Sequence, residues 1–192
     1  MRVAGLVVGV GLALSACTGP PDAEPSPSGE PTSAAPAPGP SSSPPGPAKP
    51  ERPDAMKRKD AKGAAAAAEY YLSLYSYTKA TGDTEEWNTM SHRACSFCKT
   101  VSERAKEIKA NGESFTGGKL ATEVLDEYVR DDLTGIFPLD IQITQAAYTT
   151  RSSSGKVIDE SKRATDIRRI EMGRQDGAWV VVTVAPVPGA ES

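Results

Sequence analysis

Apolar residues recur at steps of three and four between Ala61 and Ala80, and this spacing predicts an α-helix with one buried face. The segment is rich in alanine, which has the highest helix propensity, and Gly82 lies where a C-terminal cap is expected. The predicted buried face consists of Ala64, Ala67, Ala68, Tyr71, Leu74, Tyr75 and Thr78. This helix is therefore expected to contribute much of the core.

Two shorter helices are predicted to follow. Asp83 is suited to an N-cap, and Glu86, three residues later, is suited to complete a capping box. Ser91 is expected to cap a third helix, which Asn111-Gly112 ends. The apolar stripe of that helix is predicted to consist of Phe97, Val101, Ala105 and Ile108. The first half of the domain is therefore predicted to be helical.

The second half of the chain has the patterns of β-strands. Apolar and polar residues alternate over residues 139–144, which is the period of a half-buried strand. A strand is also predicted over residues 156–172, and the nearly unbroken valine run at 179–184 predicts a well-covered strand. Turns are expected at Ser152–Gly155 and at Asp176-Gly177, where the Asp-Gly pair is a strong hairpin signal.

One segment, residues 120–129, fits both a helical stripe and a strand. Gly117-Gly118 before it and the strand-rich region after it favour a strand. The pattern then consists of helices followed by a mainly antiparallel sheet of about four strands. This order predicts an α+β fold in which the N-terminal helices pack on the sheet.

Composition changes the picture at the N-terminus. Arg2 followed by the apolar run Val3–Leu14 has the layout of a signal peptide, and that run is shorter than the about 20 apolar residues of a spanning helix. Leu14-Ser15-Ala16-Cys17 resembles a bacterial lipobox. That resemblance implies that Cys17 becomes a diacylated N-terminus. The alternative for residues 1–17 is an ordinary signal peptide with a chance cysteine.

Proline content separates a second segment, residues 18–53. It holds 13 of the 16 prolines, with Ser, Ala and Gly between them and no aromatic residue. Such a segment buries too little apolar surface to offset the entropy of ordering, and we expect a disordered tether. A single α+β domain is expected over residues 54–188, with 189–192 as a tail. The net charge of −3 and the lack of a basic stripe argue against nucleic acid as a partner.

Several short motifs of the domain occur in a consistent order between residues 60 and 185. They are Tyr70-Tyr71-Leu72 with Tyr75, Thr81-Gly82-Asp83-Thr84, Cys95-x-x-Cys98, the Gly-Gly pair and Asp176-Gly177-Ala178-Trp179-Val180-Val181. In these motifs the chain resembles a family of actinobacterial lipoproteins of unknown function. The resemblance implies a domain similar to the nuclear-transport-factor-2-like cone, in which N-terminal helices pack into a curved sheet and often leave a pocket.

Cys95 and Cys98 form the clearest chemical motif. If Cys17 is lipidated, only these two thiols remain, and outside the membrane such a pair is expected to form a disulfide. We predict that the disulfide is a local staple near the start of the third helix. Two alternatives stay open. With His92 the cysteines supply three ligands, whereas structural zinc takes four; thiol-disulfide exchange requires a preceding strand and a βαβ unit, which the pattern lacks.

A pocket enzyme of the isomerase or cyclase type is a further alternative. On a cone-like fold, Tyr71 or Tyr75 would act with a carboxylate, either Asp140 or Asp126. Tyrosines at helical spacing more often pack into the core, and alternation places Asp140 on the polar face of its strand. We therefore predict no catalytic, cofactor-binding or metal-binding residue.

Together these patterns predict a lipid-anchored protein on the extracytoplasmic face of the cell membrane. Its expected role is non-catalytic binding of an envelope protein or of a small apolar ligand. The long spacer motivates this hypothesis, because an enzyme that acts on small solutes needs no such reach. The membrane, through the lipid anchor, is the expected partner.

Overall fold

The computed structural model describes residues 47–189, so the predicted signal peptide, Cys17 and most of the proline-rich segment lie outside the described residues. The helices are η1 (Asp54–Lys57), α1 (Ala61–Thr81), α2 (Glu85–Thr89) and α3 (Ser96–Ala110). Among residues 47–189, no helix has both the length and the apolar character that crossing a membrane requires.

The long helix α1 begins and ends where its sequence predicts. The Asp60 side chain accepts a hydrogen bond of 3.1 Å from the Gly63 amide, and Gly82 adopts a left-handed conformation with φ of 69°. A β-carbon on Gly63 would lie 2.4 Å from the Arg58 carbonyl oxygen, so only glycine permits this close approach of the chain. The predicted apolar face is buried, except that Tyr75 is half-buried. These contacts place α1 at the centre of the core.

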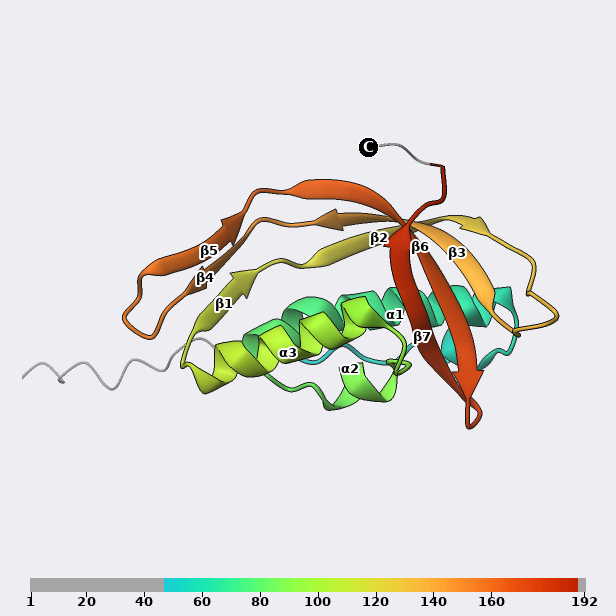
Figure 1. The fold of residues 1–192 in the computed structure, drawn as a ribbon, viewed down its shortest axis with the longest axis horizontal. Helices are drawn as coiled ribbons and strands as arrows, with labels where there is room; N and C mark the ends of the chain where they lie inside the picture. The colour runs from blue at the N-terminus through green and yellow to red at the C-terminus, as the bar shows by residue number, and fades with distance from the viewer. Residues whose placement is uncertain (1–46, 190–192) are drawn as a thin grey trace, which may run out of the picture. The chain divides into compact units, whose positions relative to one another are not determined.

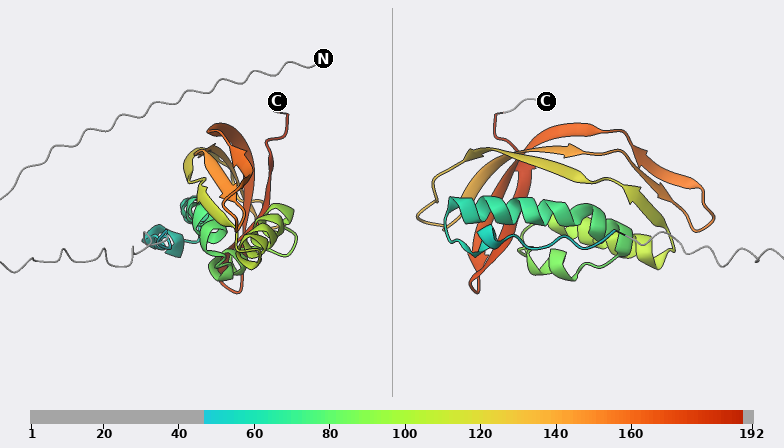
Figure 2. Two further views of the ribbon diagram at one scale, coloured as in Figure 1. Left: turned by 90° about the vertical axis from the view of Figure 1, so that its left-hand side faces the viewer. Right: turned by 180° about the vertical axis from the view of Figure 1, so that it is seen from behind.

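Within residues 47–189, seven strands follow the helices. They are β1 (Ser114–Gly117), β2 (Leu120–Glu127), β3 (Phe137–Gln145), β4 (Tyr148–Arg151), β5 (Val157–Ser161), β6 (Ala164–Gln175) and β7 (Ala178–Pro186). One antiparallel sheet has four strands in the order β2-β3-β6-β7, and the other has three in the order β1-β4-β5. Figure 1 and Figure 2 show the sheets arching over α1 and α3, so the face toward the helices is concave. The predicted α+β class and cone-like arrangement are confirmed.

The three-stranded sheet arises because three long strands are interrupted at neighbouring positions. Beyond the interruption they continue as a second sheet. The segment predicted as one strand over 156–172 divides at residues 162–163 into β5 and β6, and β3 leads into β4 through residues 146–147. At Gly117, φ is 82° and an added β-carbon would lie 2.2 Å from the Ala147 carbonyl oxygen. The bend therefore needs glycine where the end of β1 meets the backbone before β4. The predicted single sheet of about four strands did not include β1 and β4.

The third helix starts later than predicted. Ser91 does not cap it; α3 begins at Ser96, after Cys95. Instead, the backbone around Ser91 pairs with β7: the Val181 amide donates to the Met90 carbonyl over 2.7 Å, and the His92 amide donates to the Val181 carbonyl over 2.9 Å. These bonds cover part of an edge strand, which satisfies backbone groups that would otherwise be exposed.

Glu86 does not complete the predicted capping box. The Asp83 carboxylate accepts a hydrogen bond from the Glu85 amide, but Glu86 points toward the N-terminal segment. There it accepts a hydrogen bond of 2.6 Å from Arg52 Nε and one of 3.2 Å from the Tyr70 hydroxyl. Part of the segment that we placed in the tether therefore contacts the domain. Arg52 also lies over the Tyr70 ring, 5.8 Å from its centre.

Candidate functional site

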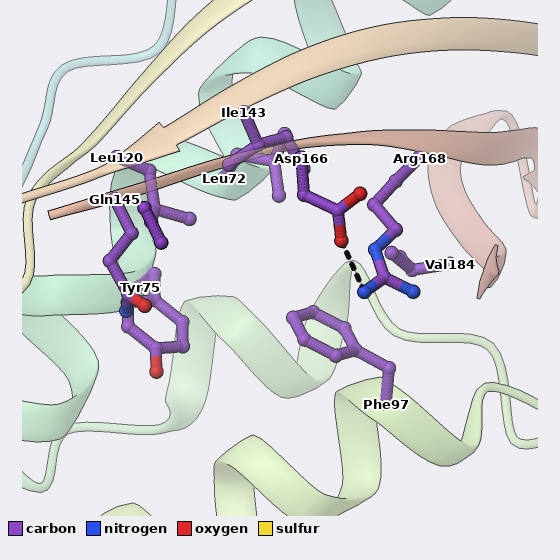
Figure 3. A pocket seen from close by; sticks show the side chains of 10 residues that line it. Leu72, Tyr75, Phe97, Leu120, Ile143, Gln145, Asp166, Arg168 and Val184 are labelled. Atoms are coloured by element: carbon purple, nitrogen blue, oxygen red, sulfur yellow. Dashed lines mark ion pairs between the residues drawn. The ribbon is translucent and has the colours of Figure 1, made fainter. Parts of the chain in front are cut away.

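A pocket of about 340 Å³ lies between the concave face of the sheet and the helices α1 and α3 (Figure 3). Each secondary-structure layer contributes to its wall. The lining residues are Leu72, Tyr75, Phe97, Leu120, Ile143, Gln145, Ala164, Asp166, Arg168 and Val184. Most of these side chains are apolar, so the pocket suits an apolar molecule held by a few polar contacts.

One end of the pocket carries an ion pair. Asp166 and Arg168 lie two residues apart on β6, and their side chains are bonded to each other. Strand β7 pairs with β6 only as far as Arg168, which faces Pro186. Both side chains of the pair are more than one third exposed. Figure 3 shows Arg168 beside Val184 at this end of the pocket.

The other end of the pocket holds Tyr75 and Gln145, which Figure 3 shows beside Leu120. Lys79, one turn after Tyr75 on α1, donates a hydrogen bond of 3.3 Å from Nζ to the Tyr75 hydroxyl. Lys79 is only 7% exposed, which is rare for a lysine. Its Nζ lies 4.4, 5.2 and 5.3 Å from the ring centres of an aromatic cluster: Phe115, Tyr148 and Tyr75.

Tyr71, the other tyrosine proposed for a pocket enzyme, does not line this pocket. Its ring stacks on Trp87 with a centroid separation of 4.0 Å, and its hydroxyl lies 2.9 Å from Ser91 Oγ. Burial raises the pKa of Tyr71 well above its usual range, so the phenol stays protonated. Tyr71 is therefore part of the core, as expected for a tyrosine at helical spacing.

The two proposed carboxylates also lie away from the pocket. Asp126 is exposed on β2, and Asp140 lies on the convex face of β3, opposite the pocket. Alternation predicted that face for Asp140, but not its burial. The Arg169 guanidinium bonds Asp140 through Nε over 2.5 Å and through a terminal nitrogen over 2.9 Å, and the Tyr128 hydroxyl donates over 2.8 Å. The hydrogen bonds from Arg169 lower the pKa of Asp140, against the effect of burial.

Cys95 and Cys98 lie at the start of α3, with their sulfur atoms 1.98 Å apart, in a disulfide. Cys95 is 2% exposed and Cys98 is 1% exposed. The Cys98 carbonyl accepts a hydrogen bond of 2.9 Å from Trp87 Nε1, and the Cys98 amide donates to Cys95 Sγ. The disulfide therefore joins the packing between α2 and α3.

His92 lies three residues before this pair and makes a local contact. Its Nδ1 atom accepts a hydrogen bond of 3.2 Å from the Ala94 amide. Within residues 47–189, no three His, Cys, Asp or Glu side chains are grouped as metal ligands. In this structure the motif of residues 91–100 forms a connection between α2, β7 and α3.

Four polar residues at or beside the pocket are not among the candidates predicted from sequence: Lys79, Gln145, Asp166 and Arg168. Periodicity contained part of the signal. Lys79 lies four residues after Tyr75, and Asp166 and Arg168 share the face of β6 that carries Ile170. What periodicity could not show is that these residues come together around one pocket.

A family model described as "Family of unknown function (DUF6318)" matches residues 35–185. The chain belongs to this family. The match spans every helix and strand except the last residue of β7, and it agrees with the predicted resemblance to a family of unknown function. Among curated proteins, no relative matches the sequence of this DUF6318 member.

Solved structures with related folds are distant from this DUF6318 member. The intermembrane-space region of the chloroplast protein ARC6 is 17% identical, with a TM-score of 0.49, and the match covers 68% of this chain and 99% of that one. An uncharacterized Caulobacter vibrioides protein with a cystatin-like fold is 14% identical, with a TM-score of 0.37 and coverages of 67% and 93%.

A third structure comes from Xanthomonas campestris and is described as a calcium/calmodulin-dependent protein kinase II association domain. It is 11% identical, with a TM-score of 0.31 and coverages of 74% and 99%. All three TM-scores are below 0.5, so these similarities give no basis for inferring a function. The function of the DUF6318 member must therefore be inferred from its own residues.

Proposed function

We propose that this chain is a lipid-anchored cell-envelope protein whose α+β domain binds a small apolar ligand without catalysing a reaction. The pocket between the concave face of the sheet and the helices carries this proposal. Its volume of about 340 Å³ lies within the range of small-molecule sites, and aliphatic and aromatic side chains form most of its wall.

The positions of the carboxylates argue for ligand binding and against a pocket enzyme. An isomerase of the kind considered would need a free carboxylate near Tyr75. Asp140 is engaged by Arg169 on the opposite face of the sheet, and Asp166 is paired with Arg168. The polar groups of the pocket therefore supply positions for recognition, while the apolar wall supplies the driving force.

The disulfide favours a structural role over thiol-disulfide exchange. An exchange reaction needs a sulfur atom that another thiolate can reach. Both Cys95 and Cys98 are almost completely buried, and Trp87 fixes the backbone here through its hydrogen bond to the Cys98 carbonyl. We therefore propose that the disulfide is a local staple, as the sequence predicted.

Binding of N-phenyl-1-naphthylamine, an uncharged apolar dye that fluoresces strongly in apolar surroundings, tests the pocket. The full-length chain is used in a Cys17→Ala background, so that no acyl chain competes for the site. We expect saturable binding that Ala164→Trp abolishes, because Ala164 lines the pocket and is exposed at its rim. The matched control is Ala121→Trp, an exposed alanine on the opposite face of the sheet. Equal binding by both variants would contradict the proposal.

The lipid anchor has a separate test. Two or more acyl chains give stable membrane attachment, because each buried methylene contributes about 0.8 kcal/mol. Cys17→Ala should move the protein from the membrane fraction to the soluble fraction after cell lysis. Cys95→Ala is the matched control and should remain with the membranes. If the Cys17→Ala protein also stays in the membrane fraction, the anchor is absent or lies elsewhere.

A further inference from the structure

The ligand's chemical class can be inferred from one unusual feature, the buried ammonium group of Lys79. Proteins rarely bury a lysine without pairing its charge. Among residues 47–189, no carboxylate lies within ion-pair distance of Lys79, and its one hydrogen bond goes to the Tyr75 hydroxyl. The aromatic cluster of Tyr75, Phe115 and Tyr148 attracts the cation but contributes no negative charge of its own.

Tyr75 transmits this charge to the pocket. Its oxygen accepts the hydrogen bond from Lys79, so its own hydrogen is free to be donated elsewhere. The Tyr75 hydroxyl donates no hydrogen bond to another described residue, and Tyr75 is a lining residue of the pocket. A donor that itself accepts from an ammonium group is polarised and forms a stronger hydrogen bond. Tyr75 is thus prepared to meet an acceptor on a ligand.

Gln145 supplies a second donor at the same end of the pocket. Figure 3 shows its side-chain amide close to the Tyr75 ring. This amide makes no hydrogen bond to another residue in the described part of the chain. At the opposite end, the charge of Arg168 is already compensated by Asp166. The two ends of the pocket therefore differ: Tyr75, which is bonded to Lys79, and Gln145 lie at one end, and a paired arginine lies at the other.

We propose that the pocket takes a small amphipathic acid, with its carboxylate at the Tyr75–Gln145 end and its apolar body along Leu72, Ile143 and Val184. This proposal rests on the proposed function, since it names the ligand class of the same pocket. The carboxylate would accept hydrogen bonds from Tyr75 and Gln145. Its negative charge would compensate Lys79, which the aromatic cluster keeps out of water.

Displacement of N-phenyl-1-naphthylamine by octanoate and by 1-octanol at pH 7 tests the proposal. The two molecules share their chain length and differ in the charged head group. We expect the Kd of octanoate to be at least about tenfold lower than that of octanol, as for a hydrogen bond to a charged group. Tyr75→Phe and Lys79→Met should each raise the octanoate Kd by about tenfold and remove this preference.

Lys106→Met is the matched control, because it removes one positive charge from an exposed position on α3, away from the pocket. It should retain the preference for octanoate. An equal loss in Lys106→Met and Lys79→Met would mean that long-range attraction, and not the buried lysine, selects the ligand. If Lys79→Met fails to fold by circular dichroism, Tyr75→Phe alone decides, because it removes a single hydroxyl.

The outcomes separate this proposal from the proposed function. If the dye binds in the pocket but octanoate and octanol displace it equally, or octanol displaces it better, the acid is wrong and the apolar pocket stands. If the dye does not bind, or binds equally to Ala164→Trp, the proposed function itself fails. If the unmodified pocket prefers octanoate, and Tyr75→Phe and Lys79→Met each remove this preference, the result supports both the proposed function and the amphipathic acid.

Discussion

The two faces of the four-stranded sheet use polar residues in opposite ways. On the convex face, the carboxylate of Asp140 receives hydrogen bonds from Arg169 and Tyr128, and the Arg169 guanidinium lies 4.5 Å from the Tyr128 ring centre. On the concave side, Gln145 of β3 and Tyr75 of the facing helix α1 donate no hydrogen bond to another described residue, and Tyr75 accepts one from the buried Lys79. Both faces come from the same strands.

This difference separates structural from binding polar groups. A buried polar group whose bonds are all satisfied within the protein stabilises the fold and has nothing left to offer a ligand. A half-buried donor without an acceptor costs stability unless something else supplies the partner. The convex network of Asp140, Arg169 and Tyr128 therefore has a structural role, and the concave donors are the groups that the proposed ligand would meet.

The largest expected effect comes from neighbouring residues on opposite faces of β3. Ile141 is completely buried on the concave side, and Ile141→Ala should lower the free energy of unfolding by about 3 kcal/mol, since it removes buried methylenes and leaves a cavity. Gln142→Ala, on the convex side, should change it by less than about 0.5 kcal/mol. Urea unfolding measures both, and similar values for the two would contradict the assignment of faces.

The next effect tests the convex network. Asp140→Asn keeps the shape of the side chain but leaves Arg169 without a counter-charge, and we expect a loss of about 2 kcal/mol in unfolding free energy at pH 7. Glu123→Gln, at an exposed carboxylate on β2 that pairs with Gln142, is the control and should be nearly neutral. Equal losses in the two variants would show that the network contributes nothing specific.

The same variant has a defined pH dependence. Hydrogen bonds from Arg169 lower the pKa of Asp140 in the folded protein below its unfolded value of about 3.9. Its contribution is therefore fully present above that value and is lost as the pH falls through the folded pKa. The stability difference between wild type and Asp140→Asn should be constant from pH 7 to 5 and shrink below about pH 4. A difference that grows on acidification would reverse the assigned sign.

A smaller effect on stability is expected from the disulfide, to which we assign a structural role like that of the convex network. Its loop is very short, so the double substitution Cys95→Ser, Cys98→Ser should cost about 2 kcal/mol or less. Thermal unfolding with and without reductant measures this, and Trp87 fluorescence reports the local change, since its indole bonds the Cys98 carbonyl. A reduction potential below about −300 mV is expected of a structural disulfide. A potential near −120 mV would instead indicate an oxidant of other thiols.

The smallest effect on stability is expected from a substitution on the concave face of the sheet, at Gln145. Gln145→Met replaces a side-chain amide that bonds no described residue, so the free energy of unfolding should change by less than about 0.5 kcal/mol. Octanoate binding should nevertheless weaken severalfold, because a donor to the carboxylate is lost. Gln142→Met, on the convex face, should affect neither quantity. Loss of stability without loss of binding in Gln145→Met would assign Gln145 to the structural group.

Local sequence rules determined much of the framework. Periodicity and capping residues predicted α1 and its ends, alternation placed Asp140 on the convex face of β3, and Asp176-Gly177 predicted the turn between β6 and β7. These features depend on residues a few positions apart, whose backbone preferences act wherever the segment lies. The order of helices and strands then sufficed for the α+β class.

Tertiary contacts decided the features on which the proposed binding rests. Bends at one level divide the long strands, and strand β7 takes the backbone around Ser91 as a partner instead of leaving Ser91 to cap α3. Lys79 is buried only because Phe115 and Tyr148, distant in sequence, close over it. The sequence by itself determined which face each side chain takes, because that depends on local geometry. Which partner it meets there depends on strand register and bending, and only the folded chain brings those together.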